Sequence, residues 1–173
     1  MKFLKRLFTF SSPLNKKKTT TQKPNPPRYE DIPKDRLVTI GGHIDEVKVH
    51  LRIFGEELDP DEITRLLGCQ STESRRKGDV IPDKRYHRIA SRGSWLLDGK
   101  LDSSIELEQQ VKSLLEMVTD DIRIWHDLAS RFQLDISCGL FLDNMNRGFE
   151  LSPELMKYLA DRNIKIGFDI YAP

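Results

Sequence analysis

Three segments of the chain alternate between apolar and polar side chains with a period of two. They lie at residues 47–54, 134–143 and 164–171. This alternation is typical of strands with one face buried and one face in water, whereas parallel strands covered on both faces are apolar throughout. The sequence therefore predicts a sheet that other elements cover on one side only, and it argues against a doubly wound α/β fold.

Helix signals separate these strands. Asp59 and Ser152 are each followed by proline, which is the pattern of an N-cap residue and a first helical residue. Gly68 and Asn163 are expected to end the two short helices. Apolar residues at helical spacing predict a longer helical stretch between them, interrupted by a new cap at residues 119–120.

These signals combine into an α+β fold. A fourth, shorter strand is expected at residues 93–97. Two strand–cap–helix units, at residues 51–68 and 140–163, resemble each other and are joined by the long helical stretch. They favour a ferredoxin-like sandwich, with a mainly antiparallel sheet of about four to five strands and helices packed on one face.

The polar face of the predicted sheet combines aromatic and charged side chains. Its members are Phe54, Phe141, Tyr171, Lys48, His50, Arg52, Lys165, Asp135 and Asp169. Aromatic residues on an open sheet can stack on RNA bases, but carboxylates there repel the phosphate backbone. Mixed charge with aromatic residues suits a protein interface better. Residues 93–100 or a second copy of the chain could also cover this face.

The first 42 residues differ in composition from the rest. They carry 10 Lys/Arg against 3 Asp/Glu, whereas residues 43–173 carry 18 against 24. Residues 14–27 are polar, basic and proline-rich, so they cannot bury enough apolar surface to offset the entropy of ordering. We predict a disordered basic tail and linker at residues 1–42 and a single α+β domain at residues 43–173.

The tail has three open interpretations: a passive linker, a weak contact with a membrane surface, or a nonspecific contact with nucleic acid. Lys5 and Arg6 interrupt its apolar start, so no secretory signal is recognised, and no apolar run is long enough to span a membrane. Only two cysteines occur, Cys69 and Cys138, and we expect both to be buried free thiols. These features predict a cytoplasmic protein.

The densest positive charge outside the tail lies between residues 75 and 92. The candidate partner-binding residues there are Arg75, Arg76, Lys77, Arg85, His87, Arg88 and Arg92. A basic loop of this kind can grip phosphates, pair with acidic groups of a protein partner, or pair with the domain's own surface. No glycine-rich phosphate loop accompanies it, and all three interpretations stay open.

No group of residues has the spacing of a catalytic or metal site. The histidines are scattered, and His50 has no predicted partner beside it in sequence. The acidic residues between 56 and 62 are better explained by helix capping than by acid–base chemistry or calcium binding. Cys138 lies on an inward strand face and is assigned to the core. We therefore expect a protein that is not an enzyme, with no metal and no cofactor.

Five blocks of sequence resemble a bacterial family of unknown function, DUF4279. They are LRIFGEELDPDEI (51–63), KGD (77–79), GSWLL (93–97), LSPEL (151–155) and IGFDIY (166–171). The resemblance supports the domain boundary and implies no activity, but such proteins resemble small accessory or immunity-type factors. The leading hypothesis is a non-enzymatic protein-binding factor that inhibits or regulates a partner. The alternative is a nucleic-acid-binding module that uses the tail and the 75–92 loop. The oligomeric state is left open.

Overall fold

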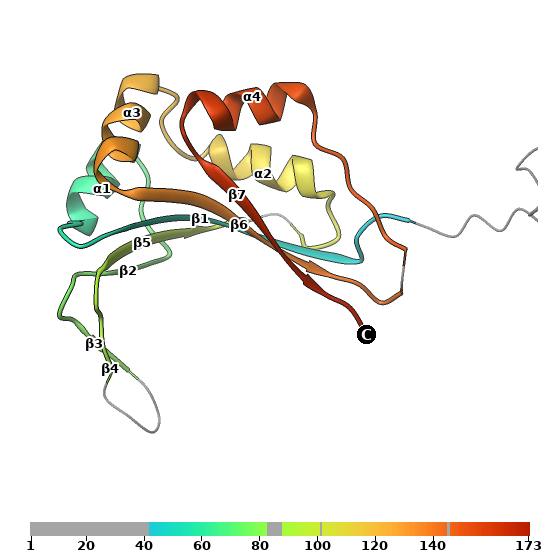
Figure 1. Cartoon of the computed structure of the whole chain (residues 1–173), viewed down its shortest axis with the longest axis horizontal. Helices are drawn as coiled ribbons and strands as arrows, with labels where there is room; N and C mark the ends of the chain where they lie inside the picture. The colour runs from blue at the N-terminus through green and yellow to red at the C-terminus, as the bar shows by residue number, and fades with distance from the viewer. Residues whose placement is uncertain (1–41, 83–87, 101, 145) are drawn as a thin grey trace, which may run out of the picture. The chain divides into compact units, whose positions relative to one another are not determined.

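A five-stranded mixed sheet with four helices makes up most of the described chain (Figure 1). The structure is a computed structural model that describes residues 42–82, 88–100, 102–144 and 146–173. The elements in chain order are β1 (Glu46–Gly55), α1 (Pro60–Leu67), β2 (Glu73–Arg75), β3 (Val80–Ile81), β4 (Arg88–Ile89), β5 (Gly93–Asp98), α2 (Leu107–Leu115), α3 (Ile122–Arg131), β6 (Gln133–Phe141), α4 (Pro153–Asp161) and β7 (Lys165–Tyr171).

The strand order of the large sheet is β2-β5-β1-β6-β7. β1 is central and antiparallel to both β5 and β6, and β2 is antiparallel to β5. β6 and β7 are parallel neighbours because the connection between them runs through α4. The α+β class is confirmed, but the ferredoxin-like sandwich is not, because the sheet is mixed. The alternation of β7 did not reveal a parallel strand, since its helix-side face alone is covered.

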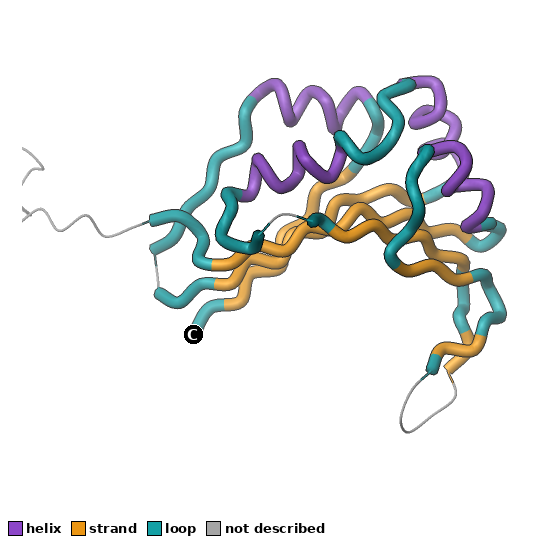
Figure 2. Tube along the Cα trace, turned by 180° about the vertical axis from the view of Figure 1, so that it is seen from behind, coloured by secondary structure: helices purple, strands orange, loops and turns teal. Residues whose placement is uncertain are grey.

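All four helices lie on one side of the sheet (Figures 1 and 2). The helix-side face of β1 contributes Val47, Val49, Leu51 and Ile53, each at most 2% exposed. The alternating residues of β5 and β6 complete this face, and the apolar sides of the helices pack on it. The one-sided sheet predicted from the alternation is therefore present, and the strands expected at residues 47–54, 93–97, 134–143 and 164–171 are confirmed within one or two residues.

The helix caps follow the sequence signals. Asp59 accepts a hydrogen bond from the main-chain N–H of Asp61 at 3.1 Å, and Gly68 ends α1 with a left-handed φ of 69°. Ser152 caps α4 in the same way, and Asn163 follows that helix with φ 53°. The new cap after the predicted break is Asp121 rather than a residue at 119–120.

The segment after α1 contains strands that the sequence did not predict. β2 adds three residues to one edge of the large sheet, and β3 and β4 form a separate two-residue pair. This β3–β4 pair leaves the sheet on the side away from the helices (Figures 1 and 2). Strands of two or three residues are too short to show a period of two. The sequence pattern therefore predicts a loop in this segment.

The predicted tail at residues 1–42 lies outside the described residues except for Gly42, so its boundary with the domain stays a prediction. In the described ranges, no helix is long and apolar enough to cross a membrane. Cys138 is buried as expected, but Cys69 is only half-buried because it follows the end of α1.

Gln110 is a buried polar residue of α2 that ties the start of β1 to the turn before α2. Its side-chain amide donates to the main-chain oxygens of Val47, Asp102 and Ile105 at 3.0–3.2 Å, and the residue is 3% exposed. These acceptors come from the start of β1 and from the turn before α2. The buried amide therefore has acceptors for its N–H groups, and it ties the start of β1 to the turn before α2.

We predict that Gln110→Leu lowers the free energy of unfolding by about 2 kcal/mol, because it removes the hydrogen bonds that the buried amide donates to the start of β1 and to the turn before α2. Gln109→Leu is the matched control, since Gln109 is exposed on the same helix. Urea denaturation of both variants measures the difference. Equal effects of the two substitutions would contradict this role for the buried amide.

Glu108 joins α2 to the start of α4. Its carboxylate accepts hydrogen bonds from Ser152 N at 2.6 Å and Ser152 Oγ at 2.8 Å, and it pairs with Lys112. The hydrogen bond from Lys112 and those from Ser152 lower the pKa of Glu108 from 4.5 to about 2. Since Ser152 caps α4, the ionised carboxylate fixes the position of that helix.

Glu108→Gln should destabilise the fold by about 1 kcal/mol at neutral pH, where the carboxylate is charged. A lowered pKa in the folded state contributes stability above the unfolded pKa and loses it as the pH falls through the folded pKa. The difference in free energy of unfolding between wild type and Glu108→Gln should therefore shrink as the pH falls from 4.5 to about 2. Urea denaturation across this range measures it, with exposed Glu150→Gln as the control. A difference in free energy of unfolding that does not change with pH would contradict the stabilising role of the ionised Glu108 carboxylate.

Candidate functional site: the open sheet face

The sheet face opposite the helices is not covered by any other described element. Its side chains form rows across the strands because the strands are in register. One end of the face carries Phe54 and Gln133, the middle carries rows centred on Arg52 and His50, and the far end carries Phe141 and Tyr171. We call this surface the open face.

The middle row of the open face joins three strands. His50 of β1 lies opposite Asp98 of β5 on one side and Ser137 of β6 on the other. Its Nδ1 is 2.7 Å from Asp98 Oδ1. No partner for His50 follows from the sequence alone, because Asp98 is 48 residues away and lies one residue beyond the predicted strand. Strand register alone could have identified the pair.

The order Ser137, His50 and Asp98 matches the residue types of a nucleophile, base and acid. However, no hydrogen bond between Ser137 and His50 is found in the described structure. Ser137 lies in the middle of β6, where the main chain is paired with β1 and β7, so neighbouring N–H groups are not directed at a substrate oxyanion. The arrangement therefore favours a structural pair over a hydrolytic site.

The neighbouring row is also internally paired. Arg52 Nε donates to Asp135 Oδ1 at 2.7 Å, which ties β1 to β6. At the far end, the rings of Phe141 and Tyr171 stack with centroids 4.7 Å apart, and Lys48 Nζ lies 5.0 Å from the Phe141 ring. The aromatic and mixed-charge face predicted from the sequence is thus assembled, and the charges at its centre, Arg52 with Asp135 and His50 with Asp98, lie in opposite pairs.

The other end of the open face contains Arg92, one of the predicted partner-binding residues. Its guanidinium lies 4.1 Å from the centroid of the Phe54 ring and donates to Gln133 Oε1 at 3.1 Å. Arg88 is exposed on β4, and the described part of the chain provides its side chain with no ion pair. Arg85 and His87 lie outside the described residues.

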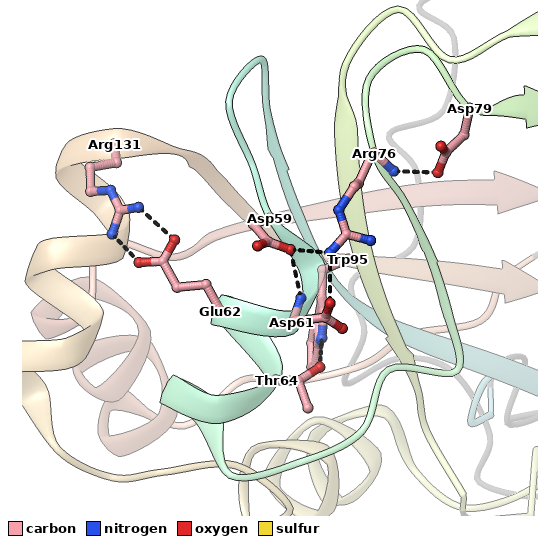
Figure 3. Close-up of polar contacts among 8 residues, drawn as sticks. All are labelled: Asp59, Asp61, Glu62, Thr64, Arg76, Asp79, Trp95 and Arg131. Atoms are coloured by element: carbon pink, nitrogen blue, oxygen red, sulfur yellow. Dashed lines mark hydrogen bonds and ion pairs between the residues drawn. The ribbon is translucent and has the colours of Figure 1, made fainter.

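The remaining predicted partner-binding residues, Arg75, Arg76 and Lys77, are paired with the domain's own acids. Figure 3 shows the contacts of Arg76. Arg76 Nη2 donates to both Asp59 and Asp61 at 2.6 Å, and these pairs raise the pKa of Arg76. Lys77 pairs with Glu56 at 2.7 Å, which raises the pKa of the amine and lowers that of the carboxyl. Arg75 pairs with Glu73 on the same strand. These contacts support the interpretation of a structural loop for residues 75–77.

The acidic cluster after β1 is accordingly structural. Glu62 of α1 forms two parallel hydrogen bonds of 2.9 Å with Arg131 of α3 (Figure 3), and this interaction lowers the pKa of Glu62. Trp95 Nε1 donates to Thr64 Oγ1 at 3.1 Å in the core beneath the cluster. Asp59 therefore caps α1, as the capping interpretation predicted. In addition to this cap, ion pairs of the carboxylates hold α1 to the loop and to α3.

The described residues indicate neither a metal site nor a reactive thiol. They contain no group of three or more His, Cys, Asp or Glu side chains that could hold a metal ion. Burial raises the pKa of the Cys138 thiol to about 12, so it is protonated and unreactive at neutral pH. Two hollows lie on the helix side, one of about 510 Å³ between α2 and α4 and one of about 1070 Å³ near the starts of β1 and α2. The larger hollow is lined by His43 and Ser152 among others. Ser152 Oγ donates to Glu108 and accepts from the main-chain N–H of Leu155, and His43 lies beside Glu106, so the described contacts do not pair this serine with the histidine.

Comparison with family models gives one match, to the domain of unknown function DUF4279 over residues 45–173. The chain belongs to the DUF4279 family. No match was found among curated proteins or among solved structures. The DUF4279 region begins next to the first residue of β1 and contains every described strand and helix, so the open face and the β3–β4 pair are parts of the family domain.

Within this DUF4279 domain, Arg76 and Arg88 should differ in what they contribute. Arg76→Gln should lower stability, because Asp59 and Asp61 lose their shared cation, and the effect should shrink at high salt. Arg88→Gln should leave stability unchanged, because the charge has no partner in the described chain. Thermal unfolding at low and high salt measures both. A larger loss of stability for Arg88→Gln than for Arg76→Gln would contradict the structural role of Arg76 and the absence of such a role for Arg88.

Proposed function

We propose that this chain is a protein-binding factor of the immunity or regulatory type, which acts on a partner protein by covering part of its surface rather than by catalysis. The partner contacts the open face together with the β3–β4 pair. A cytoplasmic location, as predicted from the sequence, is part of this proposal.

The observation that carries the proposal is the pair of aliphatic side chains on the strands β3 and β4. Val80 is 60% exposed and Ile89 is 67% exposed. The two strands project on the same side of the sheet as the open face (Figure 2). Exposed aliphatic residues beside a surface of paired charges are typical of an interface with an apolar centre and a polar rim.

The charge pattern supports a protein partner over nucleic acid. The open face carries Asp98, Asp135 and Asp169, which would repel phosphates. Arg76 and Lys77 are engaged with carboxylates of their own domain, so they would have to give up these pairs to bind phosphate. Nucleic-acid binding through the tail and the 75–92 segment remains the alternative function.

The proposal predicts that capture of the partner depends on the β3–β4 pair. The full chain is used as bait in its native cells, and a protein retained in stoichiometric amount is identified by mass spectrometry. We expect the double variant Val80→Asp/Ile89→Asp to lose this protein, because a charge at the centre of an apolar contact is not compensated.

Met156→Asp is the matched control. Met156 is an aliphatic residue of α4 that is 50% exposed on the helix side, so the same change there should leave capture intact. If the control loses the protein and the β3–β4 variant keeps it, the interface is on the helix side and the proposal fails. If the chain instead retains nucleic acid in a salt-sensitive manner, the alternative function holds. A partner activity that is unchanged by the purified chain would contradict inhibition.

A further inference from the structure

β7 is the long edge of the sheet. The strand order ends in β2, which has three residues, and in β7, which has seven. No other described element runs along the outer side of β7 (Figure 1). A strand of this length at an edge presents unpaired N–H and C=O groups that readily pair with another strand.

Two opposite charges lie on the open face of β7, and neither has an ion-pair partner in the described chain. Lys165 and Asp169 are both exposed. Across β6, Lys165 lies opposite Asp135, which already binds Arg52, and Asp169 lies opposite Gly139, which has no side chain. The two charges are four residues apart on one strand, so they stand on the same face and flank Gly167.

We infer that β7 pairs in antiparallel orientation with β7 of a second copy of the chain, with Gly167 opposite Gly167. In this register, Lys165 of each copy lies opposite Asp169 of the other. Two-fold symmetry therefore forms both ion pairs at once. A Cβ atom added at Gly167 would meet nothing within 4 Å, so no described residue covers the open face between Lys165 and Asp169.

Other registers pair these charges less well. Centring the pair on Lys165 places two lysines opposite each other, and centring it on Asp169 places two aspartates opposite each other, both of which are destabilising. Centring it on residue 166 or 168 leaves both charges opposite neutral residues. The register centred on Gly167 satisfies both Lys165 and Asp169, which gives the pairing its specificity.

The helix-side face of β7 is compatible with the same register. It sets Ile166 opposite Phe168 and Ile164 opposite Ile170. Ile170 is 62% exposed, and Phe149 is partly exposed where it packs on Phe168, with ring centroids 4.9 Å apart. Pairing would cover this apolar margin. It would also place the open faces of both copies on one side of a continuous sheet, because the two-fold axis is perpendicular to that sheet.

Sedimentation equilibrium of the full chain at several concentrations tests the inference. We expect a dimer. Lys165→Asp and Asp169→Lys should each weaken dimerisation roughly tenfold or more, because each variant turns two attractive pairs into two repulsive ones. The double exchange Lys165→Asp/Asp169→Lys should restore the dimer.

Lys100→Asp is the matched control, because Lys100 is exposed after the end of β5 and away from the β7 edge. Circular dichroism and thermal melting verify that each variant is folded. A chain that is monomeric at every concentration overturns the inference. So does a dimer that ignores the single substitutions, or one that the double exchange fails to restore. None of these outcomes depends on whether the β3–β4 pair binds a partner.

Discussion

The burial of one face of β1 is the interaction on which the rest of the structure depends. β1 is the central strand, and its four inward aliphatic residues contact the neighbouring strands on both sides and the helix layer above. Successive side chains of a strand point to opposite faces of the sheet. Burial of the inward residues of β1 therefore places its remaining residues on the open face. The row of His50 and the row of Arg52 are consequences of packing on the opposite side of the same strand.

The sequence predicts the parts of this fold that repeat a local rule. Alternation identified three of the four longer strands, and proline after Asp59 and Ser152 identified two helix starts. These signals arise within a few residues of the element that they specify. The strand order and the parallel pairing of β6 with β7 depend on contacts between distant residues and on the course of α4, which local patterns do not contain. The role of Gln110 does not follow from the local sequence for the same reason, since its acceptor Val47 lies 63 residues away in β1 and reaches it only in the folded chain.

The sequence predicts which residues make up the candidate site better than it predicts how they pair with one another. The open face and its aromatic residues followed directly from alternation, whereas the pairing of His50 with Asp98 required the register of β1 with β5. The basic segment shows the opposite case. Counting its positive charges could not reveal that Arg76 and Lys77 face the acidic start of α1, so charge that looked available in sequence is used to hold the loop in place.

This distribution of charge explains how an uncovered sheet face can remain stable in water, and it bears on the partner contact that we propose for this face. Arg52 with Asp135 and His50 with Asp98 satisfy each other within the chain, so binding need not leave these polar groups unpaired. The side chains left without such partners lie at the margins: Arg88 and Ile89 on β4, and Lys165 and Asp169 on β7. Because the paired centre contributes shape and the unpaired margins contribute charge and apolar area, specificity is expected to reside at the two margins of the sheet rather than at its middle.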